Sequence, residues 1–178
     1  LVFTPYDYWH REHDLHHKTV GNLDKRGHGD VWTLTVEEYK ALSRNRKRIY
    51  RLYRHPLILV GLAPVLLFVI WFRIPRKSMN AAGRRSVHIT NLIVAAFVSL
   101  GILLIGWKAF LMIQLPVIYV ATVAGVWLFY VQHQFEGIYW ARKAEWDPLR
   151  AAMEGCSFLE LPRVLRWFSG SIGYHHVH

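Results

Sequence analysis

Apolar residues along this 178-residue chain gather in three unbroken blocks, at 57–72, 91–107 and 109–131. None of the three blocks contains Lys, Arg, Asp, Glu or His. A helix buried in a soluble protein usually keeps a polar stripe, whereas apolar runs of about 17–25 residues match the hydrocarbon thickness of a bilayer. The pattern therefore predicts an all-α integral membrane protein.

Only a short turn around 106–108 separates the second and third blocks, so we expect 91–107 and 109–131 to form a transmembrane helical hairpin. The first block is shorter, and it contains Gly61 and Pro64. Basic residues flank this block on both sides, and a true crossing would place those flanks on opposite faces of the membrane. We therefore interpret 57–72 as an interfacial or re-entrant segment.

The formal net charge of +10 would suggest a nucleic-acid partner in a soluble protein, but the basic residues follow the membrane topology instead. If 91–131 is a hairpin, every Lys and Arg except Lys108 lies on one side of it, as expected for the cytosolic face. Cys156 is the only cysteine, so no intrachain disulfide can form. These features argue against nucleic-acid binding and favour a membrane protein with a cytosolic cap.

The polar segments predict helices on either side of a glycine-containing loop. Residues 6–17 contain no helix breaker. Further along, Thr35 and Glu38 have the spacing of a capping box, which opens a predicted helix over 35–54. That helix mixes aromatic and aliphatic side chains with many basic residues. A basic amphipathic helix of this kind lies on a membrane surface.

Eleven histidines are present, and most of them cluster near the two ends of the chain. His13 is followed by histidines at i+3 and i+4, so three imidazoles share one face of the first predicted helix. The second cluster repeats the i, i+3 spacing, and another histidine follows the last apolar block. This pattern is typical of a metal site. The candidate ligands are His13, His16, His17, His133, His175 and His178.

The predicted hairpin places all six candidate ligands on one face of the membrane, whereas a first block that crossed the bilayer would separate the clusters. Imidazole binds zinc, copper, iron and nickel alike. A structural zinc is closed by about four ligands, so six histidines suit two iron ions better. Carboxylate-bridged di-iron bundles use Glu-x-x-His pairs, and the apolar blocks contain none. An all-histidine di-iron site is the better hypothesis.

The histidine motifs resemble those of membrane fatty acid desaturases. His13-Asp-Leu-His16-His17 is similar to the second histidine box of that family, HxxHH, and His175-His-Val-His178 is similar to the third box without its final histidine. The stretches 19–24, 131–134 and 145–150 resemble the bacterial-type omega-6 (delta-12) acyl-lipid branch. The resemblance covers 1–178 as a single, partial desaturase domain. It includes box two with its loop over 1–30, and a cytosolic segment with box three over 132–178.

This resemblance implies O₂-dependent introduction of a cis double bond into a fatty acyl lipid at two non-haem iron ions. Electrons would come from ferredoxin or cytochrome b5. It also implies a multi-pass protein, here of the bacterial inner membrane, with its histidine boxes on the cytosolic face. Two departures matter, because the first box (HxxxH) and the last histidine of box three are missing. We therefore expect this fragment alone to be inactive.

Other polar residues could orient ligand imidazoles through their second ring nitrogen. The first candidates are His10, Asp24, Glu136 and His176, and further carboxylates in the same class are Asp14, Asp30 and Asp147. Two alternatives to a desaturase stay open. One is a related di-iron oxygenase: an acyl hydroxylase, a conjugase or a carotenoid ketolase. The other is a non-enzymatic membrane metal-binding protein, although transport needs polar ligands within the bilayer, which the blocks largely lack.

Overall fold

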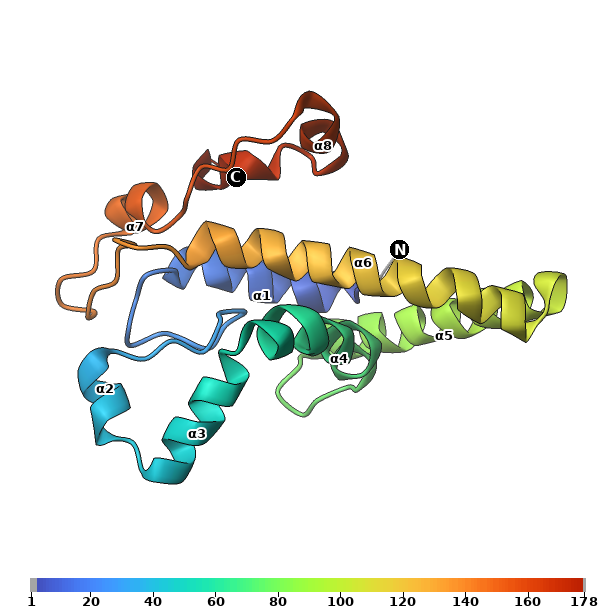
Figure 1. Ribbon diagram of the computed structural model, residues 1–178, viewed down its shortest axis with the longest axis horizontal. Helices are drawn as coiled ribbons and strands as arrows, with labels where there is room; N and C mark the ends of the chain where they lie inside the picture. Colours follow the sequence, from blue (N-terminus) through green and yellow to red (C-terminus); the bar gives the residue numbers. More distant parts are fainter. Residues whose placement is uncertain (1–2, 178) are drawn as a thin grey trace. The chain divides into compact units, whose positions relative to one another are not determined.

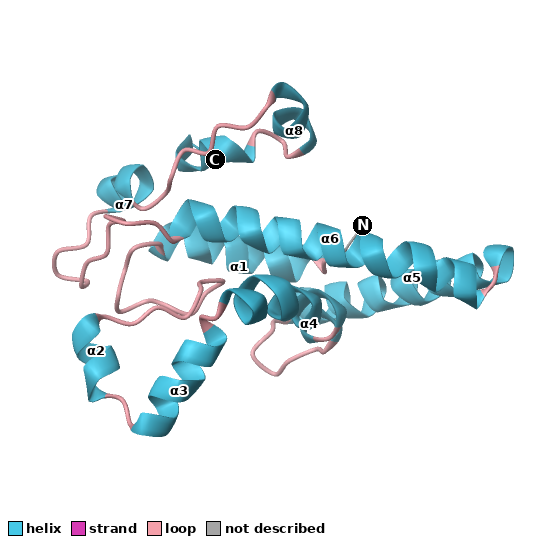
Figure 2. Cartoon of the chain, viewed as in Figure 1, coloured by secondary structure: helices cyan, strands magenta, loops and turns pink. Residues whose placement is uncertain are grey.

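The computed structural model describes residues 3–177, with side chains up to His175. Within this range the chain is helical, and its only β pairing is an isolated bridge between Asn22 and Ala141 (Figures 1 and 2). The all-α fold class is thereby confirmed. In chain order the elements are α1 Tyr6–Thr19, α2 Val36–Ala41, α3 Arg44–Tyr53, η1 Leu57–Leu62, α4 Ala63–Val69, η2 Trp71–Arg73, α5 Ala81–Ile105, α6 Trp107–His133, α7 Pro148–Glu154, α8 Arg163–Phe168 and η3 Ile172–Val177.

The contacts divide the chain into two compact units. We call residues 3–11 and 34–126 the hairpin unit, because they contain α5 and most of α6. We call residues 12–33 and 127–177 the histidine unit, because they contain most of the candidate metal ligands. Helices α1 and α6 each contribute residues to both units.

The two predicted crossings correspond to the helices α5 and α6, both long and apolar enough to span a membrane (Figure 1). Both helices are longer than the apolar blocks. Asn80 caps α5 by accepting a hydrogen bond from the Gly83 backbone N–H at 2.8 Å, and a polar first turn precedes the apolar stretch. Gly106 alone ends α5, with φ of +78°, a backbone conformation that glycine adopts without a steric cost.

Close packing of α5 on α6 depends on a small residue near the turn. A Cβ atom built at Gly101 would overlap the ring of Phe110, which is itself buried. Phe110 also contacts Phe97, with ring centroids 5.8 Å apart. Small residues allow membrane helices to approach closely, so Gly101 sets the spacing of the hairpin here.

The prediction of one helix over 35–54 is wrong, because the structure has α2 and α3 with a break between them. Thr35 and Glu38 do form the predicted capping box at the start of α2. Leu42 is then extended, and the Ser43 hydroxyl accepts a hydrogen bond from the Arg46 N–H at 3.4 Å. A serine that caps a new helix competes with continuation of the old one. The break therefore has a local cause.

The first apolar block forms a π-helical turn (η1), then α4 and a short 3₁₀ turn (η2). It meets α3 at a bend of 57°. Within residues 3–177, two helices are long and apolar enough to cross a membrane, or three if this bent pair counts as one span. Hydrogen bonds join the end of the block to α5 and to the start of the chain. The Asn91 side chain donates to the Arg73 carbonyl at 2.8 Å, and the Arg73 side chain donates to the Phe3 carbonyl at 2.5 Å. Its interfacial or re-entrant placement stays a prediction.

In the histidine unit, a set of hydrogen bonds, which we call the latch, joins the loop after α1 to the loop after α6. Leu23 N–H donates to the Ala141 carbonyl at 2.9 Å, and Ala141 N–H donates to the Gly21 carbonyl at 2.9 Å. The Trp146 indole donates to the Val20 carbonyl at 3.0 Å. A small buried core lies beside these bonds, formed by Val20, Tyr139 and Ala151. The latch therefore fixes the end of α1 relative to the end of α6.

Candidate metal centre

Helix α1 presents three histidines on one face, as the i, i+3 and i+4 spacing predicts. His16 is the most buried of them, with 2% of its surface exposed. His13 and His17 lie one turn apart, and their Nε2 atoms are 3.1 Å from each other. The His16 and His17 rings are 5.6 Å apart. The helix thus brings three imidazoles to one location.

Two histidines from distant parts of the chain complete the arrangement. His133 is the last residue of α6, His175 lies in η3, and both are buried. The Nε2 atom of His133 lies 3.2 Å from that of His16 and 2.9 Å from that of His175. The ligand atoms of His16, His133 and His175 all lie within 4.8 Å of one another, close enough to hold one metal ion.

His175 also links the buried three to the pair on α1, because its ring centroid is 4.8 Å from that of His17 and 6.4 Å from that of His13. The structure therefore brings together five of the six candidate ligands, which we call the histidine cluster: His13, His16, His17, His133 and His175. The sixth candidate, His178, and the side chain of His176 lie outside the described residues.

Hydrogen bonds on the outer ring nitrogens determine which way two of these imidazoles present their lone pairs. Asp30 Oδ1 lies 2.7 Å from His16 Nδ1, and the Gly155 carbonyl lies 3.3 Å from His133 Nδ1. An oxygen acceptor at Nδ1 places the N–H there, and in the neutral imidazole that a metal binds, Nε2 then carries the lone pair. These two Nε2 atoms face each other at 3.2 Å, a repulsive arrangement that a shared metal cation turns into an attractive one. The donor set fits a metal ion.

Polar contacts within the histidine unit also hold η3 against the end of α6. The side chain of Gln132, fully buried, donates to the Ile172 carbonyl. Ser157 bonds the last turn of α6 twice, through its N–H to the Gln132 carbonyl at 2.9 Å and its hydroxyl to the Val131 carbonyl at 2.8 Å. Phe129 covers the cluster, with its ring 5.2 Å from His16 and 4.8 Å from His133. Of the five imidazoles, those of His16, His133 and His175 are buried.

Cys156 lies beside the cluster, with its sulfur 3.9 Å from His133 Nδ1. Burial raises the pKa of the Cys156 thiol to about 11. Since the thiolate is the form that binds metal, the neutral thiol expected near pH 7 is a poor ligand. The centre is therefore an imidazole site.

The remaining predicted residues have other surroundings. His10 is in the hairpin unit, where its ring lies 5.5 Å from that of Tyr6. Asp24 is exposed, and its carboxylate accepts hydrogen bonds from the Arg142 side chain at 2.7 Å and the Lys143 N–H at 2.8 Å. Glu136 is exposed in the turn after α6. An orienting role for these three stays a prediction.

Sequence reasoning did not single out Asp30 or the Gly155 carbonyl, the two groups that set the imidazole orientation. Asp30 was one of several equivalent carboxylates. The available signal was its place directly after Gly27 and Gly29, since closely spaced glycines indicate a tight loop that can aim a side chain. A backbone carbonyl leaves no signal in a sequence.

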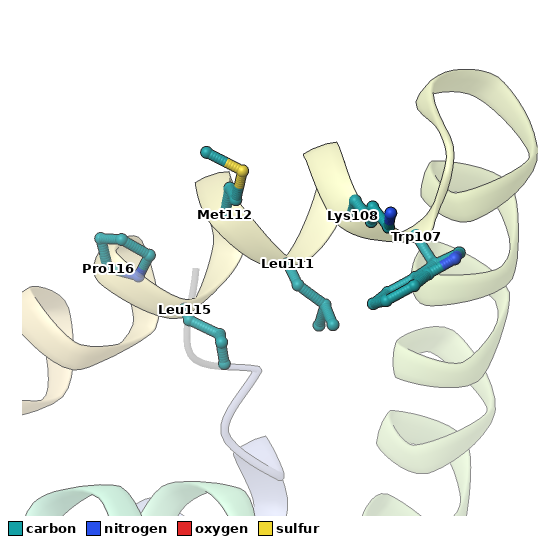
Figure 3. A pocket seen from close by; sticks show the side chains of 6 residues that line it. All are labelled: Trp107, Lys108, Leu111, Met112, Leu115 and Pro116. Carbon is teal, nitrogen blue, oxygen red and sulfur yellow. The ribbon is translucent and has the colours of Figure 1, made fainter.

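A shallow hollow on the first turns of α6 offers no comparable chemistry (Figure 3). It is lined by Trp107, Lys108, Leu111, Met112, Leu115 and Pro116. All six belong to one helix and only Lys108 is charged, so the hollow is part of the apolar surface of a membrane span.

Comparison with known proteins gives the family of this chain. The family model for fatty acid desaturases matches residues 1–178. A fatty acid desaturase of Bacillus subtilis (strain 168) is 47% identical over 178 residues, which is all of this chain and 51% of that protein. The chain thus spans about half the length of the curated relative it matches. No solved structure matches the chain. On the family match over its whole length, the chain belongs to the fatty acid desaturase family.

Proposed function

We propose that the protein carrying this chain introduces a cis double bond into fatty acyl lipids at a non-haem di-iron centre. The observation that supports this most strongly is the pair of buried Nε2 lone pairs of His16 and His133, 3.2 Å apart. Five histidines in one cluster exceed the four ligands of a structural zinc. We assign His13, His16, His17, His133 and His175 as iron ligands, with His178 as the sixth.

When bound, the iron ions supply the O₂ chemistry needed to remove hydrogens from an unactivated methylene pair, which side-chain acids and bases cannot do. The residues of this chain would hold and orient the imidazole ligands and keep water away from them. Asp30 and the Gly155 carbonyl hold the Nδ1 protons of His16 and His133. Phe129 keeps water from the same two rings. In the sequence, the apolar block 109–131 ends two residues before His133, so this span connects directly to a proposed ligand.

We further propose omega-6 (delta-12) regioselectivity, on the basis of the stretches 19–24, 131–134 and 145–150. Two of these stretches meet in the latch, where Trp146 donates to the Val20 carbonyl. Mapping the double bond in the host's lipids by mass spectrometry tests this assignment. A new double bond at another position would overturn the regioselectivity and leave the desaturase proposal standing.

The proposed location is the bacterial inner membrane, with the histidine cluster on the cytosolic face, since all basic residues but Lys108 lie outside the hairpin 91–131. A ferredoxin or a cytochrome b5 would supply electrons. We propose that the donor is an acidic protein, and that the basic residues outside the hairpin 91–131 attract it. The rate of electron transfer should then fall as ionic strength rises, and a rate independent of salt would contradict this docking mode.

The deciding experiment expresses the complete gene that encodes this chain in a host that lacks the double bond. We expect a new monounsaturated or diunsaturated acyl chain that requires O₂, and two iron ions per purified protein. A hydroxylated or conjugated acyl product would favour a related oxygenase, a ketolated carotenoid would favour a ketolase, and bound metal without any O₂-dependent product would favour a non-enzymatic metal-binding protein. Each of these outcomes would overturn the desaturase proposal.

A further inference from the structure

The loop that follows α1 in the histidine unit is shaped to deliver one carboxylate to His16. Gly27 and Gly29 have φ of +105° and +75°, which side chains with a Cβ rarely adopt. The loop then closes on itself, because the Gly27 N–H donates to Asp30 Oδ2 at 3.2 Å. The other oxygen, Oδ1, lies 2.7 Å from His16 Nδ1. Both oxygens of Asp30 therefore have defined partners.

The base of this loop is held separately from the Asp30 contact. The Arg26 side chain donates to the Leu23 carbonyl at 2.7 Å and to the Thr33 carbonyl at 2.7 Å. These bonds join the two ends of the loop whether or not Asp30 reaches His16. A change confined to the Asp30 carboxylate should therefore leave the loop and the fold in place.

Burial makes the Asp30–His16 contact strong. Only 2% of the His16 side chain and 9% of the Asp30 side chain are exposed. A carboxylate removed from water needs a hydrogen-bond donor, and a bond of 2.7 Å to a charged group is in the strong range. The contact also fixes the rotation of the His16 ring, since the opposite nitrogen, Nε2, then faces His133 at 3.2 Å.

From this geometry we infer that Asp30 is the positioning residue of the centre, which holds His16 as an Nε2 ligand and strengthens its bond to the metal. The inference rests on the proposed function, because it assumes that the cluster binds iron. It concerns the retention of iron rather than turnover. An imidazole whose outer N–H is held by a carboxylate is a better oriented and more basic ligand, and loss of such a partner weakens metal binding by about 10- to 100-fold.

The test measures how fast the purified complete protein, loaded with iron(II), releases it to a colorimetric chelator. Asp30→Asn keeps the size of the side chain and removes its charge. We expect about 10- to 100-fold faster release, with the melting temperature of the metal-free protein unchanged. The matched control is Glu160→Gln, which neutralises an exposed carboxylate of the same unit and should release iron at the wild-type rate.

A second pair of variants separates positioning from a structural role. If Asp30 acts through His16, Asp30→Asn should have no further effect on iron release in a His16→Ala background, because the two changes remove the same interaction. Three results would overturn the inference. Asp30→Asn could release iron at the wild-type rate, its effect could add to that of His16→Ala in the double variant, or it could lower the melting temperature of the metal-free protein. A wild-type protein that holds iron and forms no double bond would overturn only the proposed function.

Discussion

The two units of this chain differ sharply in charge. The hairpin unit has fourteen basic and three acidic residues, whereas the histidine unit has eight basic and nine acidic residues. Between Glu38 and Glu136 the chain has no acidic residue at all. The excess of positive charge therefore belongs to the hairpin unit, and the histidine unit, which contains the histidine cluster, is nearly neutral. The candidate metal centre therefore belongs to the part of the chain in which the charges nearly balance.

The units also differ in what they bury. In the hairpin unit, large apolar side chains face outward: Leu103 is 81% exposed and Met112 is 77% exposed. In the histidine unit, some of the most buried side chains are polar, including His16 and Gln132. Outward apolar groups suit contact with lipid, and inward polar groups require specific partners. We therefore expect the hairpin unit to respond to changes in packing, and the histidine unit to changes in polar contacts.

The largest expected effect comes from removing one histidine of the cluster. His133→Ala should weaken iron retention and lower double-bond formation, each by more than the ~10- to 100-fold that loss of an outer partner costs. The control is His88→Ala, an exposed histidine on α5 in the hairpin unit, which should retain iron and activity. Gas chromatography of host lipids and metal analysis measure both. Equal loss of iron and activity in both variants would show that the histidine cluster is no more important for metal binding than a histidine of the hairpin unit.

A packing change should affect the hairpin unit without loss of metal. Gly101→Ala places a Cβ against the ring of Phe110, and overpacking of this kind costs about 1–3 kcal/mol. The control is Gly125→Ala, because a Cβ at Gly125 in α6 meets no other atom within 4 Å and alanine favours a helix. Thermal unfolding in detergent should show a lower melting temperature for Gly101→Ala only. Iron content per folded molecule should stay at the wild-type value.

The fold could be predicted where a long pattern decides it. The apolar blocks at 91–107 and 109–131 exceed what any soluble element needs, so α5 and α6 follow from length and composition alone. The break between α2 and α3 could not be predicted in the same way. It depends on whether the Ser43 hydroxyl bonds the Arg46 N–H or leaves the helix to continue, and that competition is decided by contacts rather than by residue type.

The histidines of the candidate site could be predicted from their spacing and from the predicted topology. The i, i+3 and i+4 positions of α1 fix a shared helix face. A hairpin over 91–131 predicts that His133 lies on the same side of the membrane as α1. The partners of these imidazoles could not be identified, because the choice among the carboxylates rests on backbone geometry. Asp24 and Asp30 are six residues apart in one loop, yet one binds Arg142 and the other binds His16.

A smaller effect is predicted for the latch, and it depends on pH. The Lys143 N–H and the Arg142 side chain lower the pKa of Asp24 from its ordinary value of 3.8, because they stabilise the ionised carboxylate. A pKa that is lower in the folded state adds stability above the unfolded pKa, and that stability is lost as pH falls through the folded pKa. Asp24→Asn should therefore melt below the wild type at neutral pH, and the gap should close below about pH 4.

A second exposed carboxylate provides the comparison for this latch. The pKa of Glu154 is also lowered, by a hydrogen bond from Arg150, which lies four residues away on the same helix. Glu154→Gln should also melt below the wild type at neutral pH, and this difference should close over the same acidic range. The difference should be smaller than for Asp24→Asn, since a local pair of this kind joins no distant segments. Asp24 joins two loops 118 residues apart in sequence. Equal gaps in the two variants, or a gap that widens in acid, would show that the Asp24 contact does not hold the histidine unit together.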